Sequence, residues 1–323
     1  MNRMNVLSNQ ISPLEGELSI SYTNSNPSFL KKVKNGIPQL VIPIWLVSPF
    51  FCLYKLFNGT FDTKLNLLLI LLYQYWFHRK TKILRQIFGS FKYYEFFDGF
   101  QVIIEDTEAM LKPSESLFPF HPHGILCTGM NATAQSHSFF RKAEVVGTQL
   151  AGDYPWGGLI MKFYGIEGAY PENFNRLMKE KKNIMFVPGG FEEATITVYG
   201  KDRVFIKHRK GFIKLALEYG YTVYPCYIFG ETKLYYTHTN EKIGLFLNKF
   251  KLPGLMAYSK NLLLPNENVK LFTVVGKGIS MPVIPNPTQE HVDKFHALYI
   301  EKLVEVYDRW KGVCGGEDKL EIL

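Results

Sequence analysis

SLFPFHPHGILCTG, residues 116–129, places two histidines between two apolar runs. The first run, SLFPF, has the length and composition of a buried strand. It stops at HPHG, where Pro122 keeps the preceding residue extended and Gly124 lets the backbone turn tightly into the next segment. We therefore expect His121 and His123 at the exit of a strand, with side chains that can point into a cleft.

The HPHG motif carries the groups that base-catalysed acyl transfer to an alcohol needs. An imidazole titrates near neutral pH and can take a proton from a hydroxyl group. The turn into the next segment also presents the backbone N–H groups of Gly124 and Ile125, which suit an anion or a developing oxyanion. The motif predicts that His121 or His123 acts as a general base beside these amides.

Two other interpretations of the same motif stay open. A His-x-His pair can bind a metal ion, but such a site needs further ligands at a recognisable spacing. The sequence has no HExxH, HxxEH or paired-cysteine motif, so we predict that no metal is bound here. The remaining interpretation is a loop with two structural histidines.

A second apolar run ends in a proline-glycine turn at FVPGGFEEA, residues 186–194. Gly189 and Gly190 permit close approach of the backbone to a ligand. The turn brings Glu192 and Glu193 to the sheet edge, where we expect Glu193 to orient a catalytic histidine or to bind the hydroxyls of an acceptor. An ordinary loop with solvated glutamates is the alternative.

The segment KDRVFIKHRKGF, residues 201–212, gathers positive charge ahead of a helix. Arginine forks and helix N-termini both favour phosphate groups. We expect this segment to bind phosphates through Arg203, Lys207, Arg209 and Lys210. A solvated basic face is the alternative, and nucleic acid is disfavoured because no zinc finger, RNP-like motif or basic helix accompanies the segment.

The composition indicates a globular protein with extra apolar surface. Of the 323 residues, 46% are hydrophobic and 15% aromatic, which excludes a disordered or collagen-like polymer. The net charge of +8 fits nucleic acid, an anionic membrane or a phosphorylated substrate, and charge alone does not choose among them. The four cysteines are widely scattered, which is typical of reduced, structural thiols.

A long apolar stretch precedes the HPHG region. Residues 37–57 have roughly the length needed to cross a hydrocarbon core, and a shorter apolar run covers 65–77. Lysines and arginines flank both outer ends, so the positive-inside rule places both ends in the cytoplasm. We predict a membrane-embedded hairpin; the alternative is a surface-binding first run followed by a buried core helix.

From about residue 90 onward, short apolar runs alternate with helical patterns, which predicts an α/β fold. The chain then divides into a flexible leader over 1–30, the hydrophobic hairpin over 31–85 and a cytosol-facing domain over 86–323. The expected strands include 183–187, 222–230 and 271–276, and the expected helices are 172–182, 210–219 and a long last helix that Thr288 caps.

Several blocks of the sequence, taken in order, resemble a known family. They are HPHG, the PGG turn with Glu193, HRKGFIKLALEYG, YIFGE and the ending TVVGKGISMPVIPNPTQEHVDKFHALYIEKLVEVYDRW. Together they are similar to the type-2 diacylglycerol acyltransferases, a family that includes monoacylglycerol and wax-alcohol acyltransferases. The resemblance implies acyl transfer from acyl-CoA to diacylglycerol, with monoacylglycerol or a long-chain alcohol as the alternative acceptor.

The same resemblance implies a fold, a site and a location. The fold would be a glycerolipid-acyltransferase-like mixed sheet with flanking helices, and His121 and His123 would be the active-site residues. No cofactor is implied, because acyl-CoA is a substrate. The protein would lie in the endoplasmic reticulum membrane and at lipid droplets, with the bilayer, acyl-CoA and a neutral-lipid alcohol as partners; association with further copies of the chain stays open.

One feature of the broader glycerolipid acyltransferases is missing. Their His-x4-Asp motif pairs the base with an aspartate, whereas Leu126 and Thr128 stand at the corresponding positions here. Glu193 is then the candidate for part of the work of that aspartate. Outside this class of enzyme, the alternatives are a metal-dependent lipid hydrolase that uses the His-x-His pair and a non-catalytic membrane lipid-binding protein.

Overall fold

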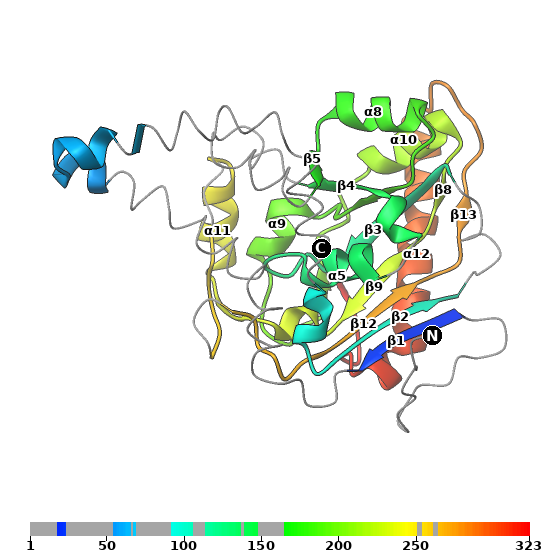
Figure 1. Cartoon of the computed structure of the whole chain (residues 1–323). Helices are drawn as coiled ribbons and strands as arrows, with labels where there is room; N and C mark the ends of the chain where they lie inside the picture. The colour runs from blue at the N-terminus through cyan, green and yellow to red at the C-terminus, as the bar shows by residue number, and fades with distance from the viewer. Residues whose placement is uncertain are drawn as a thin grey trace, which may run out of the picture.

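A mixed β-sheet forms the centre of the protein (Figure 1). The computed structural model describes residues 18–23, 54–65, 67–68, 92–105, 114–136, 139–147, 165–250, 254–260 and 264–323. From one edge to the other, the strands are β1 (Leu18–Thr23), β2 (Gly99–Ile104), β12 (Lys270–Val275), β9 (Cys226–Phe229), β3 (Ser116–His121), β6 (Ile184–Phe186), β4 (Glu144–Gly147) and β5 (Ile166–Gly168). Strand β8 (Thr222–Val223) also pairs with β3, and β13 (Ile279–Ser280) pairs with β8.

The strands that carry the candidate motifs run in the same direction. β3 is parallel to both β6 and β9, and β4 is parallel to β6 and β5. β12 is antiparallel to β9 and parallel to β2, which makes the sheet mixed. The predicted α/β class with a mixed sheet is therefore observed.

Helices cover both faces of the sheet, so apolar side chains fill two core layers. One layer packs under α8 (Pro171–Lys179), α10 (Gly211–Tyr219) and α12 (Gln289–Cys314). The other packs under α5 (Thr128–Ser136) and the short helices η1 (Tyr93–Phe96) and η2 (Phe140–Lys142). Strand β3 serves both layers by alternation, since Leu117 joins the first and Phe118 and Phe120 join the second.

The remaining elements surround the carboxyl ends of the central strands. They are α9 (Gly190–Thr195), β7 (Arg203–Val204), η3 (Glu231–Lys233), β10 (Tyr236–His238), α11 (Glu241–Asn248), β11 (Met256–Tyr258) and β14 (Glu321–Ile322). β10 and β11 pair antiparallel, and β14 pairs parallel with β7. Beyond β14, the carbonyl oxygen of Leu323 accepts hydrogen bonds from the N–H groups of Ile206 and Lys207, at 2.8 Å each.

The long last helix begins where its cap was predicted. The Thr288 hydroxyl accepts the N–H of His291, and the Thr288 N–H donates in return to His291 Nδ1, both at 3.3 Å. Gly315, with φ 75°, ends the helix. A buried stripe at helical spacing, including Tyr299, Leu303 and Trp310, packs into the core.

Two expected elements have different limits from those predicted. The helix expected over 172–182 ends at Lys179, because Lys181 adopts a left-handed conformation (φ 57°) that a helix does not accommodate. The strand expected over 222–230 is two strands, β8 and β9. They separate at Pro225, which has no N–H group to donate to a neighbouring strand.

The amino-terminal part of the chain departs from the predicted leader. Leu18–Thr23, inside the expected flexible leader over 1–30, forms the edge strand β1 and pairs antiparallel with β2. Of the hairpin expected over 31–85, only 54–65 and 67–68 are described, with helical turns over 54–58 and 61–65. The rest of the two apolar runs, 37–57 and 65–77, lies outside the described residues. Within the described ranges, no helix combines the length and the apolar character that a membrane crossing requires.

Candidate active site

Three parallel strands bring the predicted motifs to one edge of the sheet (Figure 1). β3 ends at His121, β6 leads into the PGG turn and α9 with Glu193, and β9 leads through Gly230 to Glu231. Carboxyl ends of neighbouring parallel strands meet at the same edge of a sheet. The HPHG turn, the PGG turn and the segment around Glu231 are far apart in sequence, yet they meet at one site.

Glu193 is the centre of this site. Its side chain is fully buried, and its Oε1 accepts the backbone N–H of His123 at 2.7 Å. Its Oε2 accepts the backbone N–H of Phe205 at 2.8 Å. Both oxygens also lie 3.3 Å from His121 Nδ1. Both carboxylate oxygens thus accept hydrogen bonds from other parts of the protein, and neither is exposed to a substrate.

His121 is locked in the core rather than presented to a ligand. It has no exposed surface, and its Nε2 lies 3.1 Å from the hydroxyl oxygen of Tyr299 on α12. Burial raises the pKa of Tyr299 well above its ordinary value, so the hydroxyl keeps its proton and donates it to Nε2. Nδ1 then carries the ring proton and donates to Glu193.

His123 differs from His121 in exposure and in its free nitrogen. It is half-buried, and its Nδ1 lies 3.0 Å from the carbonyl oxygen of Gly124. A carbonyl only accepts, so Nδ1 carries the proton and Nε2 carries a lone pair. Burial lowers the pKa of His123 below the ordinary value for histidine, which keeps the ring neutral at pH 7. His123 Nε2 is therefore the nitrogen that can accept a proton.

The turn after His123 is fixed by Glu231. Gly124 has φ +57°, and a Cβ there would lie 2.6 Å from Glu231 Cγ, so both conformation and space require glycine. Glu231 accepts the N–H groups of Thr128 at 2.9 Å and Gly129 at 2.7 Å, which caps the start of α5. The N–H groups of Gly124 and Ile125 donate to no backbone acceptor within the described residues, and their role at an oxyanion stays a prediction.

The glycines of the PGG turn make room for Glu193 itself. A Cβ on Gly189 would collide with the Glu193 carboxylate, while a Cβ on Gly190 (φ +57°) would meet nothing within 4 Å. We expected these glycines to admit a ligand to the backbone. Instead, Gly189 admits the buried carboxylate, and Gly190 supplies the left-handed conformation at the start of α9.

Three of the four basic residues predicted to hold phosphates form ion pairs with acidic side chains. Arg209 forms an ion pair with Glu192, and Lys210 Nζ lies 2.7 Å from Asp293 Oδ1. Arg203 pairs with Glu241 and Glu321, and its side chain is only 13% exposed. Lys207 is exposed.

Arg209 retains one unused donor. Its guanidinium packs over the ring of Phe205, 5.4 Å from the ring centroid, and Phe205 donates its backbone N–H to Glu193. The buried Nε of Arg209 has no hydrogen-bond partner in the part of the chain that the structure describes. The basic segment and the histidine loop are thus joined through Phe205, and Lys207 and Arg209 are the members best placed for an anion.

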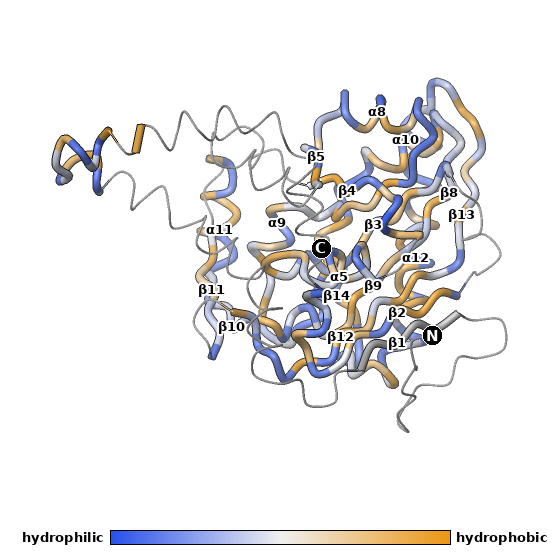
Figure 2. The backbone as a smooth tube through the Cα atoms, in the orientation of Figure 1, coloured by the Kyte–Doolittle hydropathy of each residue, from blue (hydrophilic) through white to orange (hydrophobic). Residues whose placement is uncertain are grey.

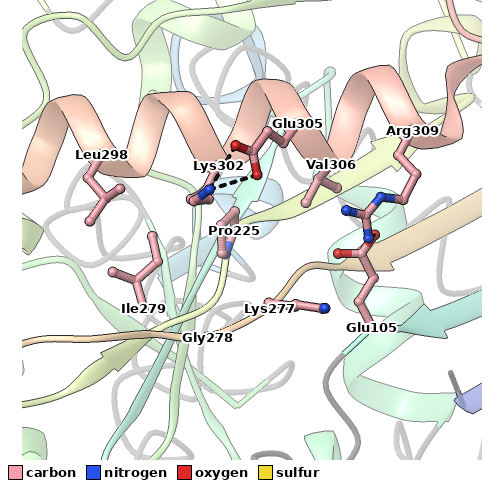
Figure 3. A pocket seen from close by; sticks show the side chains of 10 residues that line it. All are labelled: Glu105, Pro225, Lys277, Gly278, Ile279, Leu298, Lys302, Glu305, Val306 and Arg309. Atoms are coloured by element: carbon pink, nitrogen blue, oxygen red, sulfur yellow. Dashed lines mark hydrogen bonds and ion pairs between the residues drawn. The ribbon is translucent and has the colours of Figure 1, made fainter. Parts of the chain in front are cut away.

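A separate hollow of about 240 Å³ lies beside α12 (Figure 3). Its lining includes Pro225, Lys277, Lys302 and Arg309 but neither the HPHG residues nor Glu193. Lys302 pairs with Glu305 across its wall. The hollow is therefore distinct from the site at the strand ends.

Cys127 lies between the HPHG turn and α5. Burial, assisted by the charges of Glu231 and Glu193, raises the pKa of its thiol well above the ordinary value. A thiol with a raised pKa is a poor nucleophile at neutral pH. Cys127 therefore does not suit a role as a nucleophile.

Comparisons with known proteins show which family the chain belongs to. The family model described as diacylglycerol acyltransferase matches residues 56–322. The chain belongs to this family. It is 31% identical over 246 residues to diacylglycerol O-acyltransferase 2 of Mus musculus, covering 68% of this chain and 63% of the mouse protein. The proteins of the same name from Danio rerio and Dictyostelium discoideum are 30% and 27% identical, over 66% and 62% of this chain and 66% and 68% of their own lengths.

The chain thus spans less than two thirds of the length of the mouse acyltransferase it matches. Among solved structures, the 1-acyl-sn-glycerophosphate (LPA) acyltransferase PlsC from Thermotoga maritima is 13% identical and has a TM-score of 0.42. That comparison covers 86% of this chain and 97% of the Thermotoga chain.

Two residues of the site in this diacylglycerol acyltransferase family member, Tyr299 and Glu231, were not predicted from the sequence. Tyr299 lies in the apolar stripe of the last helix, and Glu231 is the last residue of YIFGE. A hydroxyl in an otherwise apolar stripe, and a carboxylate directly after a buried strand, were the available signals. Neither signal names a partner, because His121 and Thr128 lie far away in sequence.

Proposed function

We propose that this protein is an acyl-CoA-dependent O-acyltransferase that transfers a fatty acyl group to the free hydroxyl of diacylglycerol and so makes triacylglycerol. The single observation that carries the chemistry is the neutral imidazole of His123. Its Nδ1 is occupied by Gly124, its backbone is held by Glu193, and its Nε2 is left with a lone pair. Membership of the diacylglycerol acyltransferase family supports the choice of substrates.

In the proposed reaction, His123 Nε2 accepts the proton of the acceptor hydroxyl as the oxygen attacks the thioester carbonyl carbon. The carbonyl oxygen becomes an oxyanion, to which Gly124 and Ile125 donate their N–H groups. The intermediate collapses with cleavage of the carbon–sulfur bond. The imidazolium then returns the proton to the CoA sulfur, so CoA leaves as a thiol and the histidine is neutral again.

His121, Glu193 and Tyr299 position the base in this proposal rather than react. Glu193 fixes the main chain of His123, and His121 holds Glu193 from the other side. Tyr299 fixes the ring of His121 from α12. These three side chains form a rigid layer behind His123. The layer keeps the Nε2 of His123 aligned with the attacking hydroxyl, and such alignment accounts for much of the rate enhancement. Glu193 would thereby serve in place of the aspartate that the HPHG motif lacks.

The basic segment is proposed to bind the phosphates of acyl-CoA through Lys207, Arg209 and Lys210. Arg203 would hold the segment in place through its ion pairs with Glu241 and Glu321. Its connection through Phe205 to Glu193 would bring the bound CoA close to the histidine loop. Arg209 would exchange Glu192 for a phosphate oxygen, a strong bidentate partner for a guanidinium.

The proposed location is the endoplasmic reticulum membrane, and also lipid droplets, with the catalytic domain in the cytosol. The apolar runs and their basic flanks support a membrane hairpin over 31–85. A neutral lipid acceptor is soluble in a bilayer and not in water, so an enzyme at the membrane surface meets it where it is concentrated.

The test is to supply membranes containing the protein with labelled acyl-CoA and a panel of acceptors: diacylglycerol, monoacylglycerol and a long-chain alcohol. The proposal expects labelled triacylglycerol as the main ester. A different main ester would reassign the acceptor, and labelled free fatty acid without any ester would replace the transferase by a hydrolase. Lipid retention without turnover would indicate a binding protein.

A further inference from the structure

Helix α11 and strand β11 carry an exposed apolar surface next to the active site. Ile243, Phe246 and Phe250 are 59%, 56% and 62% exposed, and Met256 and Tyr258 are 73% and 55% exposed. Ile243 and Phe246 stand one turn apart on α11 and so share one side of the helix. Phe250 lies just beyond the helix end, with its ring centroid 5.4 Å from that of Phe246. We call these five residues the α11 face. Figure 2 shows apolar residues along α11, and Figure 1 places α11 at the outside of the protein beside α9.

The opposite side of α11 is fixed, so the helix cannot rotate to bury its apolar side. A Cβ on Gly244 would lie 2.6 Å from the carbonyl oxygen of Gly254 and 2.6 Å from the methyl group of Thr195, which shows how closely the helix approaches its neighbours. Asn248 donates to the Thr195 hydroxyl at 2.8 Å and to the Phe191 carbonyl at 3.5 Å. The outward direction of the α11 face is therefore built into the fold.

The charge around the α11 face points to its occupant. The sequence from 242 to 260 contains no aspartate or glutamate, and its charged residues are all lysines. Lys242, Lys249 and Lys260 are exposed in the described residues. An exposed apolar side bordered by lysines is the pattern of a helix that lies in the interface of an anionic bilayer. Two copies of the same face would instead bring their lysines together, which costs free energy.

Tyrosines extend the same pattern. Tyr236 stacks on Tyr199 with ring centroids 4.6 Å apart, and it contacts Tyr258 at 5.5 Å. Tyr199 is 41% exposed. Aromatic rings with a polar tip are enriched where hydrocarbon meets lipid headgroups. The tyrosines of β10 and β11 thus suit the headgroup boundary.

We infer that the α11 face is a docking surface for an anionic lipid membrane, distinct in sequence from the apolar runs 37–57 and 65–77. The apolar side chains enter the headgroup boundary, and the lysines contact lipid phosphates and carboxylates. The surface is one helix away from the catalytic machinery, because Thr195 and Phe191 belong to α9, which also carries Glu193. Docking would hold α9 and the histidine loop near the membrane that supplies the acceptor of the proposed reaction.

The test uses the full chain in vesicles of phosphatidylcholine and phosphatidylserine. A genetically encoded environment-sensitive fluorophore replaces Phe246 in one sample and Val313 in another; Val313 is an apolar residue of α12 with a nearly equal exposure of 55%. Lipids with a quencher near the headgroup are then added. The inference expects loss of fluorescence at position 246 and little change at 313. Equal quenching at both positions, or none at 246, would overturn it.

Two further measurements separate the lipid from other occupants. K242E/K249E in the full chain should reduce the quenching at position 246 while the apolar runs still anchor the protein, and unchanged quenching would refute the role of the lysines. Fluorescence at 246 that changes with protein density but not with the quencher lipid would mean that a second copy covers the face. These measurements involve no turnover, so they succeed or fail independently of the proposed acyl transfer.

Discussion

Glu193 Oε1 accepts the backbone N–H of His123 at 2.7 Å, and the carboxylate is fully buried. The relationship differs from the usual pairing of a carboxylate with an imidazole, because the glutamate holds the main chain of His123 and leaves its ring nitrogens alone. The ring instead takes its tautomer from the Gly124 carbonyl. Two hydrogen bonds, one to the Gly124 carbonyl and one to Glu193, therefore fix the position of the proposed catalytic nitrogen.

Replacing Glu193 tests this arrangement. In E193Q, the amide NH2 group would face one of the two N–H groups that the carboxylate now accepts. We expect the free energy of unfolding to fall by about 2–3 kcal/mol, since bonds to a charged group are lost, and the rate to fall about 100-fold because the base is misplaced. Denaturant unfolding and acyl-transfer assays measure both.

The neighbouring glutamate is the matched control for that variant. Glu192 is partly exposed and pairs only with Arg209 among the contacts of the described residues. E192Q should change the free energy of unfolding by less than about 1 kcal/mol and leave the maximal rate intact. Equal losses in E192Q and E193Q would show that the effect does not come from the buried network.

Tyr299→Phe removes only the hydroxyl that donates to His121 Nε2. A buried nitrogen would lose its partner, so the free energy of unfolding should drop by about 1–3 kcal/mol, with a smaller loss of rate than in E193Q. Urea unfolding checks the first effect. Tyr219→Phe, whose half-buried hydroxyl bonds to Asn175 at 3.1 Å, is the control and should cost less. An unchanged midpoint for Tyr299→Phe would argue against the proposed rigid layer behind His123.

The proposed phosphate site predicts a selective effect on acyl-CoA. R209A should raise KM for acyl-CoA about tenfold and leave KM for acyl-pantetheine, which lacks the CoA phosphates, unchanged. E192Q should lower KM for acyl-CoA, because it frees Arg209 from its ion pair. Arg176→Ala, an exposed arginine that pairs with Glu167 and Glu180, is the control. A rise in KM for both thioesters in R209A would refute the assignment.

The pH dependence follows from the lowered pKa of His123. Burial disfavours the protonated ring, so the neutral base persists below the ordinary histidine pKa of 6.5. The value of kcat/KM should be flat from neutral to mildly alkaline pH and fall on the acid side with a midpoint below 6.5. The negative charge of Glu193 raises the pKa of His123, so E193Q should move the midpoint to still lower pH. A midpoint above 6.5 would contradict this environment for His123.

The sequence predicted the parts of this site that follow from local chemistry. HPHG, the PGG turn and the last helix with its Thr288 cap all carry residue types with strong backbone preferences, and each lies where the pattern indicated. The alternation of apolar runs and helical patterns was enough for the α/β class.

The parts that could not be predicted depend on contacts between distant segments. The sequence left His121 and His123 equivalent, and their burial and their contacts with Tyr299, Glu193 and the Gly124 carbonyl separate them. Likewise, Arg203 looks like a ligand-binding arginine until Glu241 and Glu321 are seen beside it. The edge strand Leu18–Thr23 pairs with β2, a partner about 80 residues away that its own short sequence does not identify.

The most direct test of the account is the rate of labelled acyl transfer from acyl-CoA to diacylglycerol by H123Q. His238→Gln, a change at an exposed histidine outside the site, serves as the control. The account predicts that H123Q loses at least about 100-fold in rate with an unchanged unfolding midpoint, while His238→Gln keeps the wild-type rate. Wild-type triacylglycerol synthesis by folded H123Q would contradict the claim that His123 is the base.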